Sequence, residues 1–124
     1  MKRMIVAAAI LIFAAGCAKR KDIEFCEGVS PKGEGVHCGS VFHDGDLTAL
    51  VRASDPFGVN TLTVRVYRDE KGKLEPADSI QVEVKPDAAR AAVNLPLYRG
   101  GQYEVQVFKG DAAIAKGRVE IIEQ

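Results

Sequence analysis

The chain has 124 residues, 47% of them hydrophobic and 27% charged, which fits one globular domain rather than a disordered segment. Lysine plus arginine and aspartate plus glutamate both number 17, so the sequence lacks the basic excess typical of a nucleic-acid-binding protein. There is no tryptophan, and aromatic residues make up 6% of the chain, which leaves little material for a platform that stacks bases or sugars.

Residues 1–16 predict a cleaved signal peptide. Lys2 and Arg3 form a short positive region, and an uncharged apolar run follows over residues 4–15. This layout is typical of secretion signals, and the run is shorter than the roughly 20 apolar residues that a bilayer-spanning helix needs. Cleavage leaves 15 basic and 17 acidic groups, a formal charge of −2.

The stretch Ala14-Ala15-Gly16-Cys17 resembles the bacterial lipobox, in which a small residue precedes an invariant cysteine. The resemblance implies that the Cys17 thiol carries a diacylglyceryl group, that signal peptidase II cuts before it, and that the new amino terminus is acylated. Ala14 stands where the family usually has leucine. In the alternative, the ordinary signal peptidase cuts near Ala14 or Ala15 and Cys17 is a free thiol.

In the best-studied lipoprotein sorting system, the residue after the lipid-carrying cysteine decides between the inner and the outer membrane. Ala18 is not the aspartate that retains such proteins in the inner membrane, so the resemblance implies an outer-membrane anchor with the domain in the periplasm. Residues 17–22 then form the lipid-anchored tether, and residues 23–124 the folded domain. Six steps of about 3.4 Å give the tether a reach of roughly 20 Å, which keeps the domain close to the bilayer.

Cys26 and Cys38 are the two remaining cysteines, and an even pair in an exported protein predicts a disulfide. Three glycines and a proline lie between them, so residues 27–37 are expected to form a loop with weak order of its own. The alternative is a metal site of His37, Cys38 and His43, because thiolate and imidazole suit zinc or copper. Neither the Cys-x-x-Cys nor the His-x-x-x-His spacing is present to support it.

From residue 42 onward, short runs of alternating apolar and polar residues are separated by turn signals such as Asp55-Pro56-Phe57-Gly58 and Gly110-Asp111. Period-two alternation predicts strands with one face in a core and the other in water. The expected strands cover residues 47–52, 62–67, 80–85, 91–95, 103–108 and 113–122. Six or seven such strands predict an all-β fold, a single antiparallel β-sandwich.

The stretch Leu97-Tyr98-Arg99-Gly100-Gly101-Gln102-Tyr103-Glu104-Val105 resembles the run into the sixth strand of immunoglobulin-like and fibronectin type III-like domains. The resemblance implies that Tyr103 is a tyrosine corner, whose hydroxyl bonds back to the loop backbone. Val105 stands where antibody domains have a cysteine, so the resemblance is to the immunoglobulin-like fold in the broad sense. A transthyretin-like sandwich or a small barrel also fits the strand pattern.

Catalytic patterns are missing from the sequence. There is no Gly-x-Ser-x-Gly, and His43 with Asp44 or Asp46 reads as a turn rather than as a base and its orienting partner. Leu50, Tyr67 and Phe108 fall opposite the aliphatic side of their strands. The pattern allows three alternatives for them: a partner-binding patch, scattered surface residues, or a second buried face.

These observations predict a non-enzymatic protein without a cofactor. Its expected role is that of an interaction or assembly module of the cell envelope, with the lipid bilayer and another envelope protein as partners. Two alternatives are a periplasmic inhibitor of a secreted hydrolase, which would insert the loop between Cys26 and Cys38, and a metal-binding envelope protein.

Overall fold

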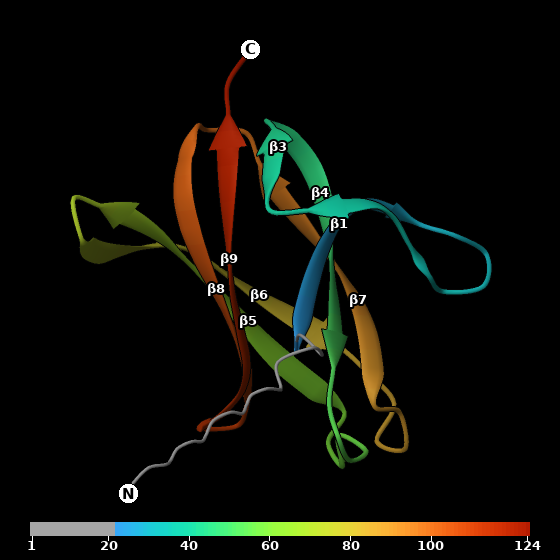
Figure 1. Cartoon of the computed structure of the whole chain (residues 1–124). Coiled ribbons are helices and arrows are strands. Elements are labelled where there is room, and N and C mark those ends of the chain that lie inside the picture. The colour runs from blue at the N-terminus through green and yellow to red at the C-terminus, as the bar shows by residue number, and fades with distance from the viewer. Residues whose placement is uncertain (1–21) are drawn as a thin grey trace, which may run out of the picture.

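The computed structural model describes residues 22–124, which fold into two β-sheets packed face to face (Figure 1). The strands are β1 (Ile23–Val29), β2 (Gly35–Gly39), β3 (Val41–His43), β4 (Gly45–Arg52), β5 (Thr61–Glu70), β6 (Lys73–Glu83), β7 (Arg90–Leu97), β8 (Gly101–Lys109) and β9 (Ala112–Ile122). The predicted β-sandwich is therefore confirmed. The signal peptide, Cys17 and most of the predicted tether lie outside the described residues.

The strand order within the sheets is that of an immunoglobulin-like sandwich. One sheet has the order β2-β1-β4-β7 and the other the order β3-β9-β8-β5-β6. The β4-β7 pair corresponds to strands B and E of that fold, and β6-β5-β8-β9 corresponds to strands C′, C, F and G. All strand pairs in residues 22–124 are antiparallel except β3 with β9, which run parallel.

The core lies between the sheets and is built from the alternation that the sequence displays. Leu62, Val64 and Val66 of β5 are buried, as are Val105 and Val107 of β8. Each fully buried aliphatic side chain of this size contributes about 1.5–3 kcal/mol. The opposite sheet contributes the buried residues Phe25, Leu47, Ala49, Val51, Val93 and Leu95.

The chain forms more strand than the sequence predicts. β5 and β6 meet at a two-residue turn in which Lys71 has φ 57° and Gly72 has φ 87°, as a type I′ hairpin turn requires. The polar run of residues 69–73 predicts a five-residue hairpin loop, but both strands extend into it and leave a loop of two residues. Throughout residues 22–124, no helix is long and apolar enough to cross a membrane.

Candidate functional site

A disulfide joins Cys26 of β1 to Cys38 of β2, which face each other across the strand pair, so the predicted pairing is confirmed. Cys26 is fully buried and Cys38 is exposed. Gly35 lies under the disulfide: a Cβ at this position would clash with both sulfurs and would lie 3.2 Å from Leu50 Cδ1. The hairpin can therefore close over Leu50 only with glycine at position 35.

The segment between the cysteines is an ordered hairpin rather than the predicted loop. β1 continues to Val29, and only residues 30–34 form the tip. The Ser30 hydroxyl accepts hydrogen bonds of 3.2 Å from the backbone N–H groups of Lys32 and Glu34. The Arg90 guanidinium donates to the Gly33 carbonyl at 2.9 Å and ties the tip to β7. The hairpin extends to one side of the sandwich (Figure 1).

The three residues of the metal alternative do not share one site. His37 Nδ1 lies 3.2 Å from a carboxylate oxygen of Glu27, and both side chains are exposed. The sulfur of Cys38 is bonded to Cys26, and His43 belongs to β3 in the other sheet. A carboxylate oxygen of Glu24 lies near both sulfurs, but the Glu24 carboxylate is also paired with the Arg52 guanidinium at 3.1 Å.

Tyr103 makes the contact that defines a tyrosine corner. Its hydroxyl donates a hydrogen bond of 2.6 Å to the carbonyl of Arg99, four residues earlier. Gly101 between them has φ 147°, and a Cβ there would lie 3.2 Å from the Arg68 guanidinium. The corner fixes how the chain enters β8, at the end of the sandwich away from the first described residue, Asp22.

Leu50, Tyr67 and Phe108 do not form one patch. Leu50 is buried on the outer face of the four-stranded sheet, beneath the disulfide hairpin. Phe108 and Tyr67 belong to the other sheet, where the Arg65 guanidinium lies 4.6 Å from the centre of the Phe108 ring. Tyr67 is half-buried beside a β-bulge between β5 and β6.

A network of polar side chains occupies the outer face of the five-stranded sheet. Arg118 lies 3.3 Å from Glu104 and 2.5 Å from Asp69, and Gln106 donates to Glu104 at 2.6 Å. Glu104 is the one charged residue buried in the described part of the chain. The hydrogen bond from Arg118, followed by that from the Gly72 N–H, holds the pKa of Asp69 below its usual value.

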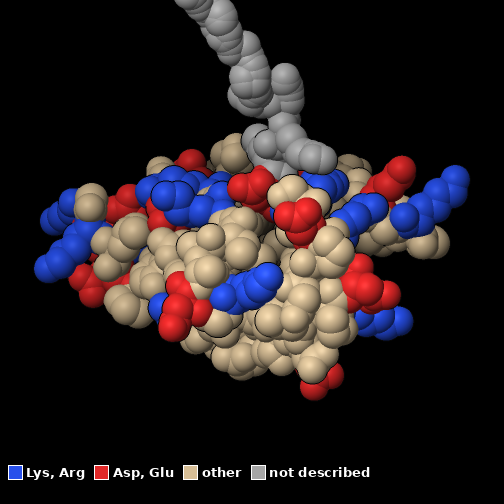
Figure 2. Space-filling view, turned by 90° about the horizontal axis from the view of Figure 1, so that it is seen from below, with Lys and Arg blue, Asp and Glu red and all other residues tan. Residues whose placement is uncertain are grey.

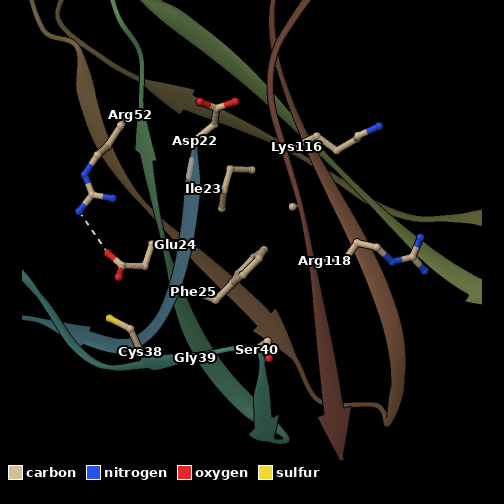
Figure 3. A pocket seen from close by; sticks show the side chains of 11 residues that line it. Asp22, Ile23, Glu24, Phe25, Cys38, Gly39, Ser40, Arg52, Lys116 and Arg118 are labelled. Carbon is tan, nitrogen blue, oxygen red and sulfur yellow. Dashed lines mark hydrogen bonds and ion pairs between the residues drawn. The ribbon is translucent and has the colours of Figure 1, made fainter. Parts of the chain in front are cut away.

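A cleft of about 920 Å³ opens where the two sheets meet beside β1 and β9 (Figure 3). Its floor is apolar because Ile23 and Phe25 point from β1 toward β9. Gly117 permits this approach, since a Cβ there would lie 3.1 Å from the Phe25 ring. Gly39, the last residue of β2, and Ser40, which links β2 to β3, close one end of the cleft.

The charged residues of the cleft stand on its two walls. On the β1 side Arg52 pairs with Glu24, and on the β9 side Lys116 and Arg118 direct their side chains away from β1 (Figure 3). Asp22 also lines the cleft, so the chain enters the fold at this site. Acidic and basic side chains are interspersed on the face seen from below (Figure 2), and neither sign dominates that face.

The strand order of the two sheets and the Cys26–Cys38 bond define an immunoglobulin-like sandwich with one disulfide-closed hairpin. No protein-family model matches the chain, and a search of the curated proteins finds no match either.

Sequence reasoning missed the cleft and the buried Glu104. The cleft joins residues 22–25 to residues 116–118, which no motif links. Glu104 alternates with buried valines and therefore reads as a solvent-facing strand residue. Its partner Arg118, which also contacts Asp69, emerges only once the register of β5, β8 and β9 is known.

Proposed function

We propose that the chain is a lipid-anchored, non-enzymatic interaction or assembly module of the bacterial cell envelope, held in the outer membrane by acylated Cys17 and facing the periplasm. The observation that carries the proposal is the Ala14-Ala15-Gly16-Cys17 motif directly after an apolar run and only six positions before the first strand residue, Ile23. A tether with a reach of roughly 20 Å holds the sandwich against the membrane surface.

The interaction role draws support from where the open cleft lies. Asp22, the residue through which the tether enters the fold, lines that cleft together with β1 and β9. Groups of the chain itself occupy part of the outer face of each sheet, the disulfide hairpin on one and the Glu104 network on the other. A partner near the bilayer would therefore meet the cleft first.

Membrane fractionation with intact-mass analysis tests the anchor. We expect the mature chain to begin at Cys17, to carry acyl mass and to sediment with outer membranes, and we expect Cys17→Ser to release it. Co-purification from detergent-solubilised membranes tests the module, and a stoichiometric envelope protein is the expected result. Unacylated Cys17, or a Cys17→Ser variant that stays in the membrane fraction, would overturn the anchor.

An inhibitor of a secreted hydrolase is the second candidate, and the hairpin geometry favours it. The tip at residues 30–34 extends from the sandwich and is fixed by the Ser30 hydrogen bonds, as an inserting loop requires (Figure 1). Exchange of the tip for Gly-Ser residues should abolish inhibition of a hydrolase such as lysozyme while Cys26–Cys38 stays closed. Retained inhibition, or none by the unaltered protein, would exclude this role.

A further inference from the structure

One edge of the five-stranded sheet is only half paired. β3 runs along β9 over Glu120, Ile121 and Ile122 and covers that part of the edge. The preceding segment of β9, residues 115–119, has β8 on one side and no strand on the other within the described part of the protein. The cleft opens beside this segment, since Lys116, Gly117 and Arg118 line it.

The hydrogen bonds at the covered end identify the backbone groups that point out of the open edge. The Glu120 N–H donates to Ser40 and the Ile122 carbonyl accepts from Asp44, so even-numbered residues of β9 face the β3 side. Backbone groups alternate along a strand, and the register from residue 115 to residue 121 has no shift. The N–H and C=O groups of Lys116 and Arg118 therefore point into the cleft.

The edges formed by β6, β7 and β2 carry features that oppose strand addition. β6 contains Pro76 and a bulge opposite β5, and β7 contains Pro96. β2 is short and is kinked at His37, which has φ 53°. Proline and bulges are common means of protecting sheet edges. Residues 115–119 contain neither, and the protection there is positive charge from Lys116 and Arg118.

Positive charge discriminates between possible strands. Two copies pairing antiparallel about Lys116 would set one lysine against the other, and like charges directly opposite each other are destabilising. Arg118 is engaged by Asp69 and Glu104, whereas no carboxylate of residues 22–124 pairs with Lys116. Lys116 is also exposed. A strand with an acidic side chain opposite Lys116 would complete this pair.

We propose that the edge formed by residues 115–119 of β9 accepts an extended segment of a partner protein as an added strand, with an acidic side chain paired to Lys116. Small side chains on its inner face would fit beside Ile23 and Phe25, which are already buried in the core. This proposal rests on the interaction role proposed above and names the surface that performs it. Main-chain hydrogen bonds supply affinity in this mode of recognition, and alternate side chains supply specificity.

Amide hydrogen exchange of the full, lipidated chain in detergent micelles tests the proposal. In the free protein, the amides of Lys116 and Arg118 should exchange rapidly, while those of Gly117 and Val119 should be protected by β8. The probe is the peptide acetyl-Ser-Thr-Ala-Glu-Val-Thr-Ser-amide, compared with the same peptide carrying lysine in place of glutamate. The acidic peptide should protect both edge amides and bind about two- to fivefold tighter than the basic one, as expected for a cross-strand charge pair.

Two variants separate the strand from a non-specific charge effect. Lys116→Glu keeps the backbone donor and should reverse the preference, so that the basic peptide binds more tightly. Lys116→Pro removes an N–H group that bonds nothing in the fold and should abolish the protection at Arg118 by either peptide. Unchanged protection of the Tyr103 and Val105 amides confirms that each variant is folded.

Three results would overturn the proposal. The first is that the Lys116 and Arg118 amides are already protected in the free chain, and the second is that their protection rises with protein concentration when no peptide is present. The third is that the acidic peptide does not protect these two amides, or protects amides of β6 and β7 equally well. These outcomes leave the broader role testable, because membrane anchoring and partner co-purification do not depend on the peptide. If a partner co-purifies equally with Lys116→Pro, strand addition is wrong and the module stands.

Discussion

The outer face of the four-stranded sheet is covered by a covalently closed hairpin, whereas that of the five-stranded sheet is covered by a network of charged side chains. In the first, the disulfide and Gly35 close over Leu50. In the second, Arg118 bridges Asp69 and Glu104. Covalent closure acts through the unfolded chain and is insensitive to salt, while ion pairs are screened by it. The two faces should therefore respond to different chemical conditions.

Removal of the disulfide should give the largest loss of stability. The bridged positions are 12 residues apart, and closure of a loop of this size contributes about 3 kcal/mol. We expect the double variant Cys26→Ala/Cys38→Ala to lose that amount in urea unfolding at both low and high salt. A reducing agent should shift the unaltered chain to the same midpoint and leave the variant where it is. An equal shift in both proteins would show that the disulfide is not the cause.

Gly35→Ala should have the next largest effect, because the added Cβ would overlap both sulfurs. Overpacking of this kind costs about 1–3 kcal/mol, and we expect free thiol to increase in a thiol titration. Gly28→Ala is the matched control in the same hairpin, since a Cβ there meets no atom within 4 Å. Equal stability of the two variants would contradict the close approach of β2 to the disulfide.

Arg118→Met should weaken the other face by about 1–2 kcal/mol, because the buried carboxylate of Glu104 loses a charged partner. The loss is limited because the Arg118 side chain is 48% exposed, and solvent weakens such pairs. It should shrink in 1 M salt, unlike the loss from the disulfide variant. Lys116→Met, two residues earlier on β9, is the control and should stay within about 0.5 kcal/mol of the parent. A loss that is independent of salt would mean that packing of the arginine stem, not charge, stabilises this face.

The strands that carry a long alternation could be predicted from sequence because their pattern is local. Leu62, Val64 and Val66 specify an inner face without reference to any neighbour. Once the lipobox resemblance assigned Cys17 to lipid, Cys26 and Cys38 were the only two cysteines left to pair. Leu50 shows the limit of such reasoning. It lies on the outer side of β4, and its burial depends on a hairpin that folds back from residues 27–39.

β2 and β3 were missed for a related reason. Gly35, Gly39 and Ser40 are turn formers, and β3 has only three residues, so no periodicity can develop. These strands form because β1 and β9 offer them edges, which is a property of the assembled sheets. The cleft arises in the same way, from a parallel strand that begins to pair with β9 only at Glu120.

The titration of Asp69 should give the smallest effect and the sharpest contrast between the two faces. Its pKa lies below the ordinary 3.8, first through the hydrogen bond from Arg118 and then through that from Gly72. A lowered folded-state pKa stabilises the fold above the unfolded value, and this contribution disappears as the pH falls through the folded value. The stability gap between the parent and Asp69→Asn should therefore be constant near neutrality and shrink below about pH 4.

Urea unfolding at a series of pH values measures that gap. In an Arg118→Met background, the pH-dependent part of the gap should largely vanish, because the first cause of the pKa shift has been removed. The gap between the parent and the double cysteine variant should stay level over the same pH range, since a disulfide does not titrate. A pH-dependent cysteine gap would show that the two faces are coupled through the core rather than closed independently. An Asp69 gap that survives without Arg118 would show that the hydrogen bond from the Gly72 N–H, not the one from Arg118, lowers the pKa of Asp69.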